Sequence, residues 1–330
     1  MTRHIVTDCA FKVISEAKVR EMMANGVEAF IMRGGYVTGV DPETSPQAQI
    51  FRKCGASFGI YRYWVTGYDA NKQGDALVKD GETNGPDCLS GDAEERKEYY
   101  SWTQAAPSYI STQYHSMAMR VKSKTARPYL NYTGPWFTDA YSLPMIDWLK
   151  ESWMWGASYP HGWDKDTPDL WPKTYAELHA KANALQFPKD PRFPTWVAWQ
   201  FGGDVIVKEI GFPLDFTIID RDDIFNWMFK GGPMPILPGI MPVPPVVNPP
   251  AVPGEVWQVA NNIKCLTVRT GPGSTYPAAP FAEWLYGVDL SLPGNQRQHA
   301  DKVAIIEKSG NWGRFADRRW VNLGCMERVG

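Results

Sequence analysis

A proline-rich segment divides this chain into two parts. Residues Gly231 to Gly254 contain nine prolines, which lack a backbone N–H and fix the φ angle, so they predict an extended spacer of the polyproline II type. Such a spacer reaches up to about 70 Å at about 3.1 Å per residue. A ligand for a partner domain is the alternative, but the interleaved Val and Met residues favour the spacer. The sequence therefore predicts a first domain over residues 1–230, a linker over 231–254 and a second domain over 255–330.

The first domain alternates helix-like and strand-like segments. A helix is expected over Ser15 to Ala24, followed by an apolar strand over Ala29 to Arg33. A second helix, with Ser45 as N-cap and ending near Cys54, precedes a strand over Phe58 to Trp64. This alternation predicts an α/β fold, a parallel barrel whose active site would lie at the carboxyl ends of the strands.

Composition argues against several classes of protein. The chain has 330 residues, of which 44% are hydrophobic and 15 are Trp, enough for two sizeable cores. A net charge of −2 argues against a nucleic-acid binder with a dense basic surface. No apolar run approaches the roughly 20 residues of a membrane span. The segment Met1 to Val13 lacks the long apolar core of a conventional signal peptide.

The cysteines and histidines give no indication of a metal or an organic cofactor. The five cysteines are scattered without a C-x-x-C pair, and the five histidines fall singly, so neither set has ligand spacing. We interpret the cysteines as reduced. Cys265 and Cys325 lie in the same small domain and could form a disulfide in an oxidising environment.

Aromatic blocks recur along the first domain. They are R-P-Y-L-N-Y-T-G-P-W-F (127–137), W-G-A-S-Y-P (155–160), W-V-A-W-Q-F (196–201) and P-L-D-F (213–216). Aromatic rings beside small residues suit a groove that stacks on the apolar faces of sugar rings, and a carboxylate at its floor can act as acid or base. The blocks therefore predict a polysaccharide cleft.

The order of these blocks resembles the glycoside hydrolase family 25 muramidases, also called Chalaropsis-type lysozymes, which include many phage endolysins. The matching segments are Tyr132-Thr133, Trp155 to Tyr159, Trp196 to Phe201 and Asp215, with Val27 to Tyr36 and Phe58 to Trp64 resembling the second and third strands. The resemblance covers roughly residues 1 to 225. It implies an irregular TIM-like (β/α) barrel that cleaves peptidoglycan between N-acetylmuramic acid and N-acetylglucosamine, without a metal or organic cofactor.

Four carboxylates stand where the resemblance implies catalytic groups. Asp8 follows the first strand candidate, Asp215 lies in the last, and Asp92 and Glu94 match the family's D-x-E signature. An i, i+2 spacing in a strand puts both members of that pair on one face, close enough to alter each other's pKa. The resemblance implies that Glu94 is the general acid and that Asp92 orients the substrate or stabilises positive charge. Asp8 and Asp215 would position and tune the pair.

The segment around Asp92 also fits a helix start. In S-G-D-A-E-E-R-K, Ser90 or Asp92 could serve as N-cap, with acidic residues in the first turn. The preceding P-D-C-L-S-G has little strand character, which departs from the family's apolar fourth strand. A turn or cap aspartate is likewise the alternative for Asp8 and Asp215.

Eight residues are candidates for binding the sugar: Tyr61, Arg62, Tyr63, Tyr132, Trp136, Tyr159, Trp199 and Gln200. Arg62 stands where the family usually has His between two aromatic residues. An Arg beside the cleft could pair with a carboxylate or with an anionic group of the substrate. Core packing is the competing explanation for these residues, most strongly for Trp199.

The second domain contains short strand-like segments separated by Gly, Pro and Asn turns. L-T-V-R-T-G-P-G (266–273), S-G-N-W-G-R-F (309–315) and W-V-N-L (320–323) resemble the bacterial SH3-like domains of cell-wall hydrolases. The resemblance implies a small all-β SH3-like barrel that binds the wall, with Tyr276, Trp284, Trp312 and Trp320 as candidate contacts. The alternative is that these rings fill the core of the small domain.

A lytic domain, a spacer and a wall-binding module without a signal peptide are typical of a phage endolysin. Such a protein is made in the host cytoplasm and reaches the cell wall at lysis, although a bacterial autolysin exported by another route has the same parts. A non-catalytic glycan-binding protein or adhesin is the main alternative, motivated by the segment before Asp92 and by Arg62. A hydrolase for a different polysaccharide would carry the same groove.

Overall fold

The computed structural model divides the chain into two compact units, Met1–Pro242 and Val243–Gly330. The residues it describes are 3–10, 12–94, 105–159, 168–235, 255–260, 265–269, 285–286, 302–305, 307–316 and 319–328. Most of the predicted linker therefore lies outside the described residues, and its role as a spacer stays a prediction.

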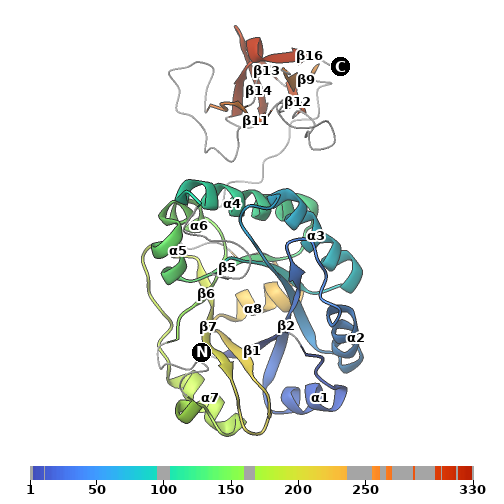
Figure 1. The fold of residues 1–330 in the computed structure, drawn as a ribbon, viewed down its shortest axis with the longest axis vertical. Helices are drawn as coiled ribbons and strands as arrows, with labels where there is room; N and C mark the ends of the chain where they lie inside the picture. Colours follow the sequence, from blue (N-terminus) through green and yellow to red (C-terminus); the bar gives the residue numbers. More distant parts are fainter. Residues whose placement is uncertain are drawn as a thin grey trace. The chain divides into compact units, whose positions relative to one another are not determined.

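The first unit is a closed barrel of eight strands with helices around it (Figure 1). The strands are β1 (His4–Cys9), β2 (Val27–Tyr36), β3 (Ser57–Tyr63), β4 (Cys88–Asp92), β5 (Tyr129–Thr133), β6 (Met154–Ala157), β7 (Trp196–Val205) and β8 (Leu214–Ile219). The α-helices are α1 (Glu16–Ala24), α2 (Thr44–Cys54), α3 (Ala70–Asn84), α4 (Pro107–Lys124), α5 (Pro135–Tyr141), α6 (Ile146–Leu149), α7 (Tyr175–Ala184) and α8 (Asp222–Phe229). Short 3₁₀ helices are η2 (Leu143–Met145) and η3 (Pro168–Leu170). The predicted irregular (β/α) barrel is confirmed.

Strand β8 runs opposite to its neighbours. Strands β1 to β7 pair in parallel, whereas β8 pairs antiparallel with both β7 and β1 to close the barrel. The connection over residues 206–213 is too short for the crossover helix that a parallel strand would need. The start of β8 therefore lies beside the carboxyl ends of the other seven strands, where barrel active sites are built.

The two predicted N-terminal helices form, but one N-cap was wrong. Helix α1 begins after Ser15, whose side chain caps it by accepting a hydrogen bond from the Lys18 N–H. Helix α2 begins at Thr44, so Ser45 lies inside it. The Ser45 hydroxyl donates instead to Asn84 Oδ1 at 2.9 Å, which ties α2 to the end of α3.

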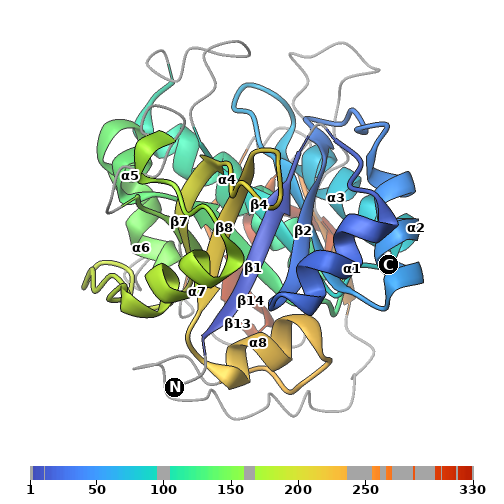
Figure 2. The ribbon, with the colours of Figure 1, turned by 90° about the horizontal axis from the view of Figure 1, so that it is seen from below.

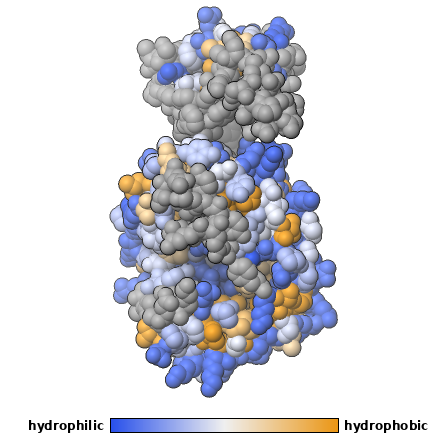
Figure 3. Space-filling model, viewed as in Figure 1, coloured by the Kyte–Doolittle hydropathy of each residue, from blue (hydrophilic) through white to orange (hydrophobic). Residues whose placement is uncertain are grey.

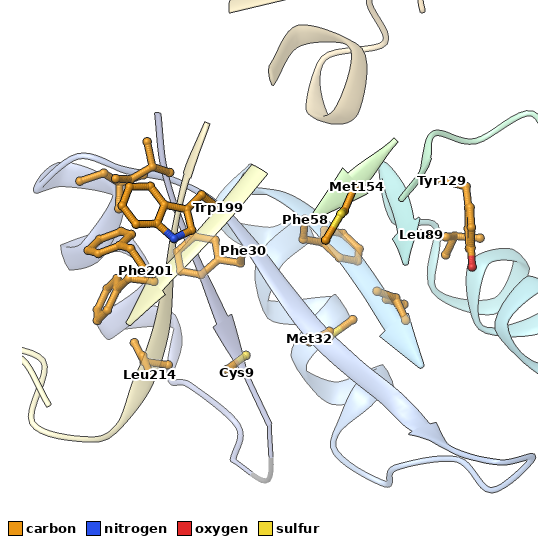
Figure 4. Packing of buried hydrophobic residues seen from close by; sticks show 14 of the residues in the cluster. Cys9, Phe30, Met32, Phe58, Leu89, Tyr129, Met154, Trp199, Phe201 and Leu214 are labelled. Atoms are coloured by element: carbon orange, nitrogen blue, oxygen red, sulfur yellow. The ribbon is translucent and has the colours of Figure 1, made fainter. Parts of the chain in front are cut away.

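Side chains on the strands alternate between two apolar cores. In β2, Phe30 and Met32 join the core between the strands and the surrounding helices, which Figure 4 shows from close by. Ala29 and Ile31 point the other way and join a second core inside the barrel. This alternation follows from the two-residue period of a strand. Both cores are continuous across the sheet, so the strands hold their side chains in fixed directions.

Helix α8 closes the end of the barrel where the strands begin (Figure 2). Its apolar residues Phe225, Trp227 and Phe229 belong to the core inside the barrel. The ring of His4, at the start of β1, stacks on Phe225 with a centroid distance of 4.0 Å. Because apolar side chains fill this end, a polar site has room at the opposite end of the strands.

The face of the barrel unit seen in Figure 3 is largely polar where its residues are described. Figure 3 shows hydrophilic residues spread over the visible described face, with hydrophobic residues in small groups between them. Within the described part of the chain, no helix is both long and apolar enough to cross a membrane. Buried residues of the helices, such as Val19, Phe51 and Leu77, belong to the core between strands and helices.

The second unit consists of short strands in three small antiparallel sheets. They are β9 (Glu255–Val259), β10 (Cys265–Leu266), β11 (Leu285–Tyr286), β12 (Lys302–Ile305), β13 (Glu307–Ser309), β14 (Trp312–Ala316), β15 (Arg319–Asn322) and β16 (Met326–Arg328), with a 3₁₀ helix η6 (Leu323–Cys325). The strand orders are β10-β11, β12-β9-β16 and β13-β14-β15. The SH3-like barrel stays a prediction, because these sheets do not close within the described residues.

The four wall-binding candidates have different positions. Trp320 is buried and Trp312 is half-buried, so the core explanation fits Trp320 and leaves Trp312 as a surface candidate. Tyr276 and Trp284 lie outside the described residues. Cys325 is a free thiol in this structure.

A buried ion pair joins β3 to α3. The fully buried Arg62 donates to Asp80 Oδ2 from Nη2 at 2.5 Å and from Nε at 3.1 Å, and its Nη1 donates to the Gly39 carbonyl at 2.6 Å. The expectation that Arg62 lies beside the cleft was wrong. Tyr61 and Tyr63 face the inside of the barrel, so the residue between them must face the helices.

We expect Arg62→Met to destabilise the protein by about 3–5 kcal/mol at pH 8, because it leaves the Asp80 carboxylate buried without its cation. Burial already raises the pKa of Asp80 to about 6 despite the charge of Arg62. A carboxyl that is protonated near pH 5 needs no cation, so the loss should be smaller there. Urea unfolding at both pH values measures the effect. A matched double variant, Arg62→Met with Asp80→Leu, should recover most of the lost stability, and an unchanged single variant at pH 8 would contradict the ion pair.

Candidate active site

A cleft of about 580 Å³ opens at the carboxyl end of the barrel strands. Its wall contains Asp8, Arg33, Tyr36, Tyr61, Tyr63, Asp92, Glu94, Tyr132, Trp155, Tyr159, Gln200, Asp204 and Asp215, together with Ala10, Lys12, Gly203, Phe212, Pro213 and Leu214. These residues come from strands β1 to β8 and from the loops that follow them. The structure thus brings all four predicted catalytic carboxylates into one cavity.

The end of β4 is held in place by its neighbours. The Asp92 carbonyl accepts from the Trp64 N–H at 2.8 Å, and the Ala93 N–H donates to the Tyr132 carbonyl at 2.9 Å. The Tyr63 hydroxyl donates to the Glu94 carbonyl at 2.6 Å. Asp92 ends a strand that pairs with β3 and β5, so the helix-start alternative for this segment was wrong. Tertiary pairing overrides the low strand propensity of this sequence.

Asp92 is buried in the cleft wall and is only 3% exposed. Burial, and then the charge of Glu94, raise the pKa of Asp92 well above its usual value, while Arg33 acts in the opposite direction. Its Oδ1 atom has no hydrogen-bond partner within the described part of the chain. An unpaired buried carboxyl oxygen is costly, so it is available for a ligand in the cleft.

Asp8 and Asp215 face each other across the closing strand pair. They are direct partners in the antiparallel register of β1 and β8, which puts their side chains on the same face. Burial, and then the charge of Asp215, raise the pKa of Asp8 well above its usual value. Burial raises the pKa of Asp215 to about 7. The two carboxyl groups titrate as a pair, so they share a proton at pH values where an isolated aspartate is ionised.

A β-bulge in β2 aims two further side chains into the cleft. The register between β2 and β3 shifts between Arg33 and Gly35, and Gly35 adopts φ +148°, a conformation that favours glycine. Arg33 and Tyr36 would lie on opposite faces of a regular strand, but the extra residue between them brings both to the cavity. Arg33 donates to Asp41 Oδ2 at 2.5 Å and lies over the Tyr36 ring.

Most of the predicted sugar-binding residues line the cleft. Tyr61, Tyr63, Tyr132, Tyr159 and Gln200 belong to its wall. The Gln200 amide nitrogen lies 3.4 Å from Asp8 Oδ2, so the same side chain contacts the carboxylate pair. Their role in binding sugar stays a prediction, supported by their position.

Two aromatic candidates lie elsewhere. Trp136, in the first turn of α5, is 44% exposed outside the cleft wall, with its indole against Gly134. Trp199 faces the helices, packs beside Phe201 (Figure 4) and donates from Nε1 to the Ser158 carbonyl at 2.7 Å. The prediction that Trp199 contacts the sugar was wrong. Gln200 faces the cleft, so its neighbour in the strand faces the core between strands and helices.

Sequence reasoning missed six charged or aromatic residues of the cleft: Lys12, Arg33, Tyr36, Trp155, Asp204 and Phe212. Alternation from Ile31, a residue inside the barrel, would have found Arg33. Trp155 stood in a recognised aromatic block, and its ring meets Tyr132 edge-on with a centroid distance of 4.7 Å. Tyr36 and Asp204 depend on bulges, for which the sequence offers only flanking glycines.

The described residues contain no group of three or more His, Cys, Asp or Glu side chains arranged to hold a metal ion. The cleft carboxylates instead face one another, tyrosine rings and Arg33. Carboxyl groups with raised pKa values beside a cation can exchange protons near neutral pH. The arrangement is therefore suited to general acid–base chemistry on a ligand with apolar faces and polar edges.

Solved structures share the fold of the first unit. The catalytic domain of endolysin Ply40 from bacteriophage P40 of Listeria monocytogenes has 21% identity and a TM-score of 0.50, with 68% of this chain and 96% of that chain covered. The bacterial lysozyme from Streptomyces coelicolor has 15% identity and a TM-score of 0.52, with 67% and 94% covered. A family 25 glycosyl hydrolase from Bacillus anthracis has 12% identity and a TM-score of 0.50, with 68% and 94% covered.

Comparison by sequence gives no match of this kind. No protein-family model matches this chain, and no curated protein matches it. The barrel nevertheless has the fold of the family 25 glycosyl hydrolases and lysozymes, as the order of the aromatic blocks predicted.

We expect Asp8→Asn to stabilise the protein by about 1–3 kcal/mol at pH 8 and to have little effect at pH 4. The folded pKa of Asp8 lies above the unfolded value, so its contribution to stability is present below about pH 4 and is lost as the pH rises through the folded pKa. An amide carries no charge and avoids that loss. Urea unfolding across this pH range measures the difference, with the exposed Asp147→Asn as control. A variant that is equally destabilised at both pH values would contradict the buried pair.

Proposed function

We propose that this protein is a peptidoglycan hydrolase, a 1,4-β-N-acetylmuramidase that cleaves between N-acetylmuramic acid and N-acetylglucosamine. The observation that carries the proposal is the meeting of Asp8, Asp92, Glu94 and Asp215 in one aromatic-walled cleft of a barrel with the lysozyme fold. The Ply40 and Bacillus anthracis structures with this fold are named as an endolysin and a family 25 glycosyl hydrolase.

Glu94 is the proposed general acid. It follows β4 in the cleft wall, where Tyr63 fixes its backbone carbonyl and leaves the side chain beside the cavity. In the reaction its carboxyl proton passes to the glycosidic oxygen as the bond to the anomeric carbon breaks. Water then adds to the anomeric carbon and gives up a proton to the Glu94 carboxylate, which leaves a new reducing end and restores the acid.

The other carboxylates support this step. Asp92 lies close enough for its charge to interact with Glu94, and its unpaired Oδ1 can accept a hydrogen bond from an acetamido N–H of the substrate. The Asp8–Asp215 pair carries at most one negative charge while it holds a shared proton. That charge favours the positive charge that develops at the anomeric carbon.

The aromatic wall provides the sugar-binding surface. Tyr61 and Tyr132 each meet Trp155 edge-on, with centroid distances of 6.4 and 4.7 Å, and all three rings belong to the cleft wall. Such surfaces suit the alternating apolar faces and hydroxyl edges of a polysaccharide.

The two observations that suggested an adhesin no longer support it. The segment before Asp92 forms a paired strand, and Arg62 is neutralised by Asp80 outside the cleft. The second unit would attach the enzyme to the wall, and the cell wall would be its place of action, as for an endolysin. A nearly neutral net charge agrees with a glycan partner rather than a nucleic acid.

We expect wild-type protein to release fragments with muramic acid at their reducing ends from purified peptidoglycan. Borohydride reduction and mass spectrometry would detect them as muramitol. Glu94→Gln removes the transferable proton and should lower the rate about 10²–10⁴-fold. Glu151→Gln, at an exposed position outside the cleft, is the matched control.

The alternatives give different results in the same assay. Glucosaminitol ends would show cleavage of the other glycosidic bond, and full activity of Glu94→Gln would place the acid elsewhere. No cleavage by wild-type protein that still sediments with cell walls would support the adhesin.

We expect Trp312→Ala to weaken binding to purified cell walls while the protein keeps its unfolding temperature, because the half-buried ring is available to a ligand. Trp320→Ala should instead lower the unfolding temperature of the second unit, because it empties a buried position. Cosedimentation and thermal unfolding measure the two effects. Unchanged wall binding by Trp312→Ala would exclude this ring as a contact.

A further inference from the structure

The hairpin between β7 and β8 carries a bulge opposite Asp215. Gly202 pairs with Phe216 and Val205 pairs with Leu214, so Gly203 and Asp204 together oppose the single residue Asp215. An extra residue in one strand bends that strand and redirects its side chains and its N–H groups. The irregularity therefore lies directly beside a proposed catalytic residue.

Asp204 adopts a left-handed backbone conformation in this bulge, with φ +54°. Its N–H donates to Asp215 Oδ1 at 2.5 Å. Non-glycine residues are uncommon in this conformation, although Asp and Asn tolerate it better than others. The left-handed conformation of Asp204 thus directs its N–H toward the Asp215 carboxylate.

The Asp204 side chain also faces the cleft. It is exposed and belongs to the cleft wall, so Asp215 on β8 lies between Asp8 on β1 and Asp204 on β7. The Asp204 charge is among the causes that raise the pKa of both Asp8 and Asp215. The other titratable or charged groups of the cleft wall are Lys12, Arg33, Tyr36, Tyr61, Tyr63, Asp92, Glu94, Tyr132 and Tyr159. Cys9 lies next to Asp8 on the other face of β1.

We propose that Asp204 is a positioning residue of this active site, which holds Asp215 through its backbone N–H and sets the charge of the Asp8–Asp215 pair through its carboxylate. The proposal rests on the proposed hydrolase function of the cleft. Asp204 does not take part in the proton transfer from Glu94 to the glycosidic oxygen. It acts through Asp215, which its backbone orients.

The two contributions can be separated with three substitutions. Asp204→Asn removes the charge and keeps a residue type that tolerates the left-handed conformation. Asp204→Gly removes the side chain and adopts that conformation freely. Asp204→Val removes the charge and strongly disfavours the conformation, so it displaces the N–H from Asp215. Asp147→Asn, at an exposed position outside the cleft, controls for the change in net charge.

The first measurement is the pH profile of kcat/KM on purified peptidoglycan. Without the Asp204 charge, the pKa of both groups of the pair falls, so the limb of the profile set by the pair should move to lower pH by about 0.5–1 unit in Asp204→Asn and Asp204→Gly. Asp204→Val also loses the N–H bond that lowers the pKa of Asp215, so its limb should lie at higher pH than in Asp204→Asn, with a further loss of about tenfold in kcat. Circular dichroism verifies that each variant is folded. Asp147→Asn should retain the wild-type profile.

The second measurement is urea unfolding between pH 4 and pH 8, which does not depend on catalysis. The pair contributes stability that is lost as the pH rises through its folded pKa values. Asp204→Asn lowers those values, so less stability should be lost and the variant should exceed wild type at pH 8 but not at pH 4.

A different result would overturn each part of the proposal. Wild-type and Asp204→Asn profiles that coincide, in activity and in unfolding, would overturn the electrostatic role. Equal kcat values for Asp204→Val and Asp204→Asn would overturn the positioning role of the N–H. If wild-type protein cleaves no peptidoglycan, the proposed function fails, and the unfolding series still decides whether Asp204 sets the charge of the pair.

Discussion

The antiparallel pairing of β8 with β1 is the constraint on which the candidate active site depends. It closes the barrel and places Asp215 directly opposite Asp8, at the end where the other strands finish. Two carboxyl groups in this position cannot both ionise without a large loss of free energy, so they hold a proton well above the usual pH. Parallel closure would have put Asp215 at the opposite end of the barrel, against the apolar residues around α8.

The surrounding structure allows this charged site to exist. Apolar side chains pack on both faces of the sheet, and α8 fills the end where the strands begin. Stability from this packing offsets the free energy lost by burying carboxyl groups in the cleft. Bulges in β2 and β7 then direct Arg33, Tyr36 and the Asp204 N–H toward the same cavity. The well-packed cores thus hold the irregular strand ends around the cleft in place, as is common in enzymes.

Strand alternation explains both the successes and the errors at residue level. Asp92 and Glu94, or Tyr61 and Tyr63, are two residues apart and share the cleft. Arg62 lies between two cleft residues and therefore faces α3, and the same rule turns Trp199 away beside Gln200. Chemistry suggested a role for Arg62 and Trp199, but the two-residue period of the strand decides which face a side chain occupies.

The sequence by itself determined the alternation of strands and helices, the polysaccharide cleft expected from the aromatic blocks, and the four carboxylates that meet there. These features follow from local periodicity, residue type and order along the chain. Only the tertiary structure decided the direction of β8, the strand before Asp92 and the bulges that aim Arg33 and the Asp204 N–H. Pairing between distant segments sets strand direction and register, and the free energy of that pairing is absent from any local stretch of sequence.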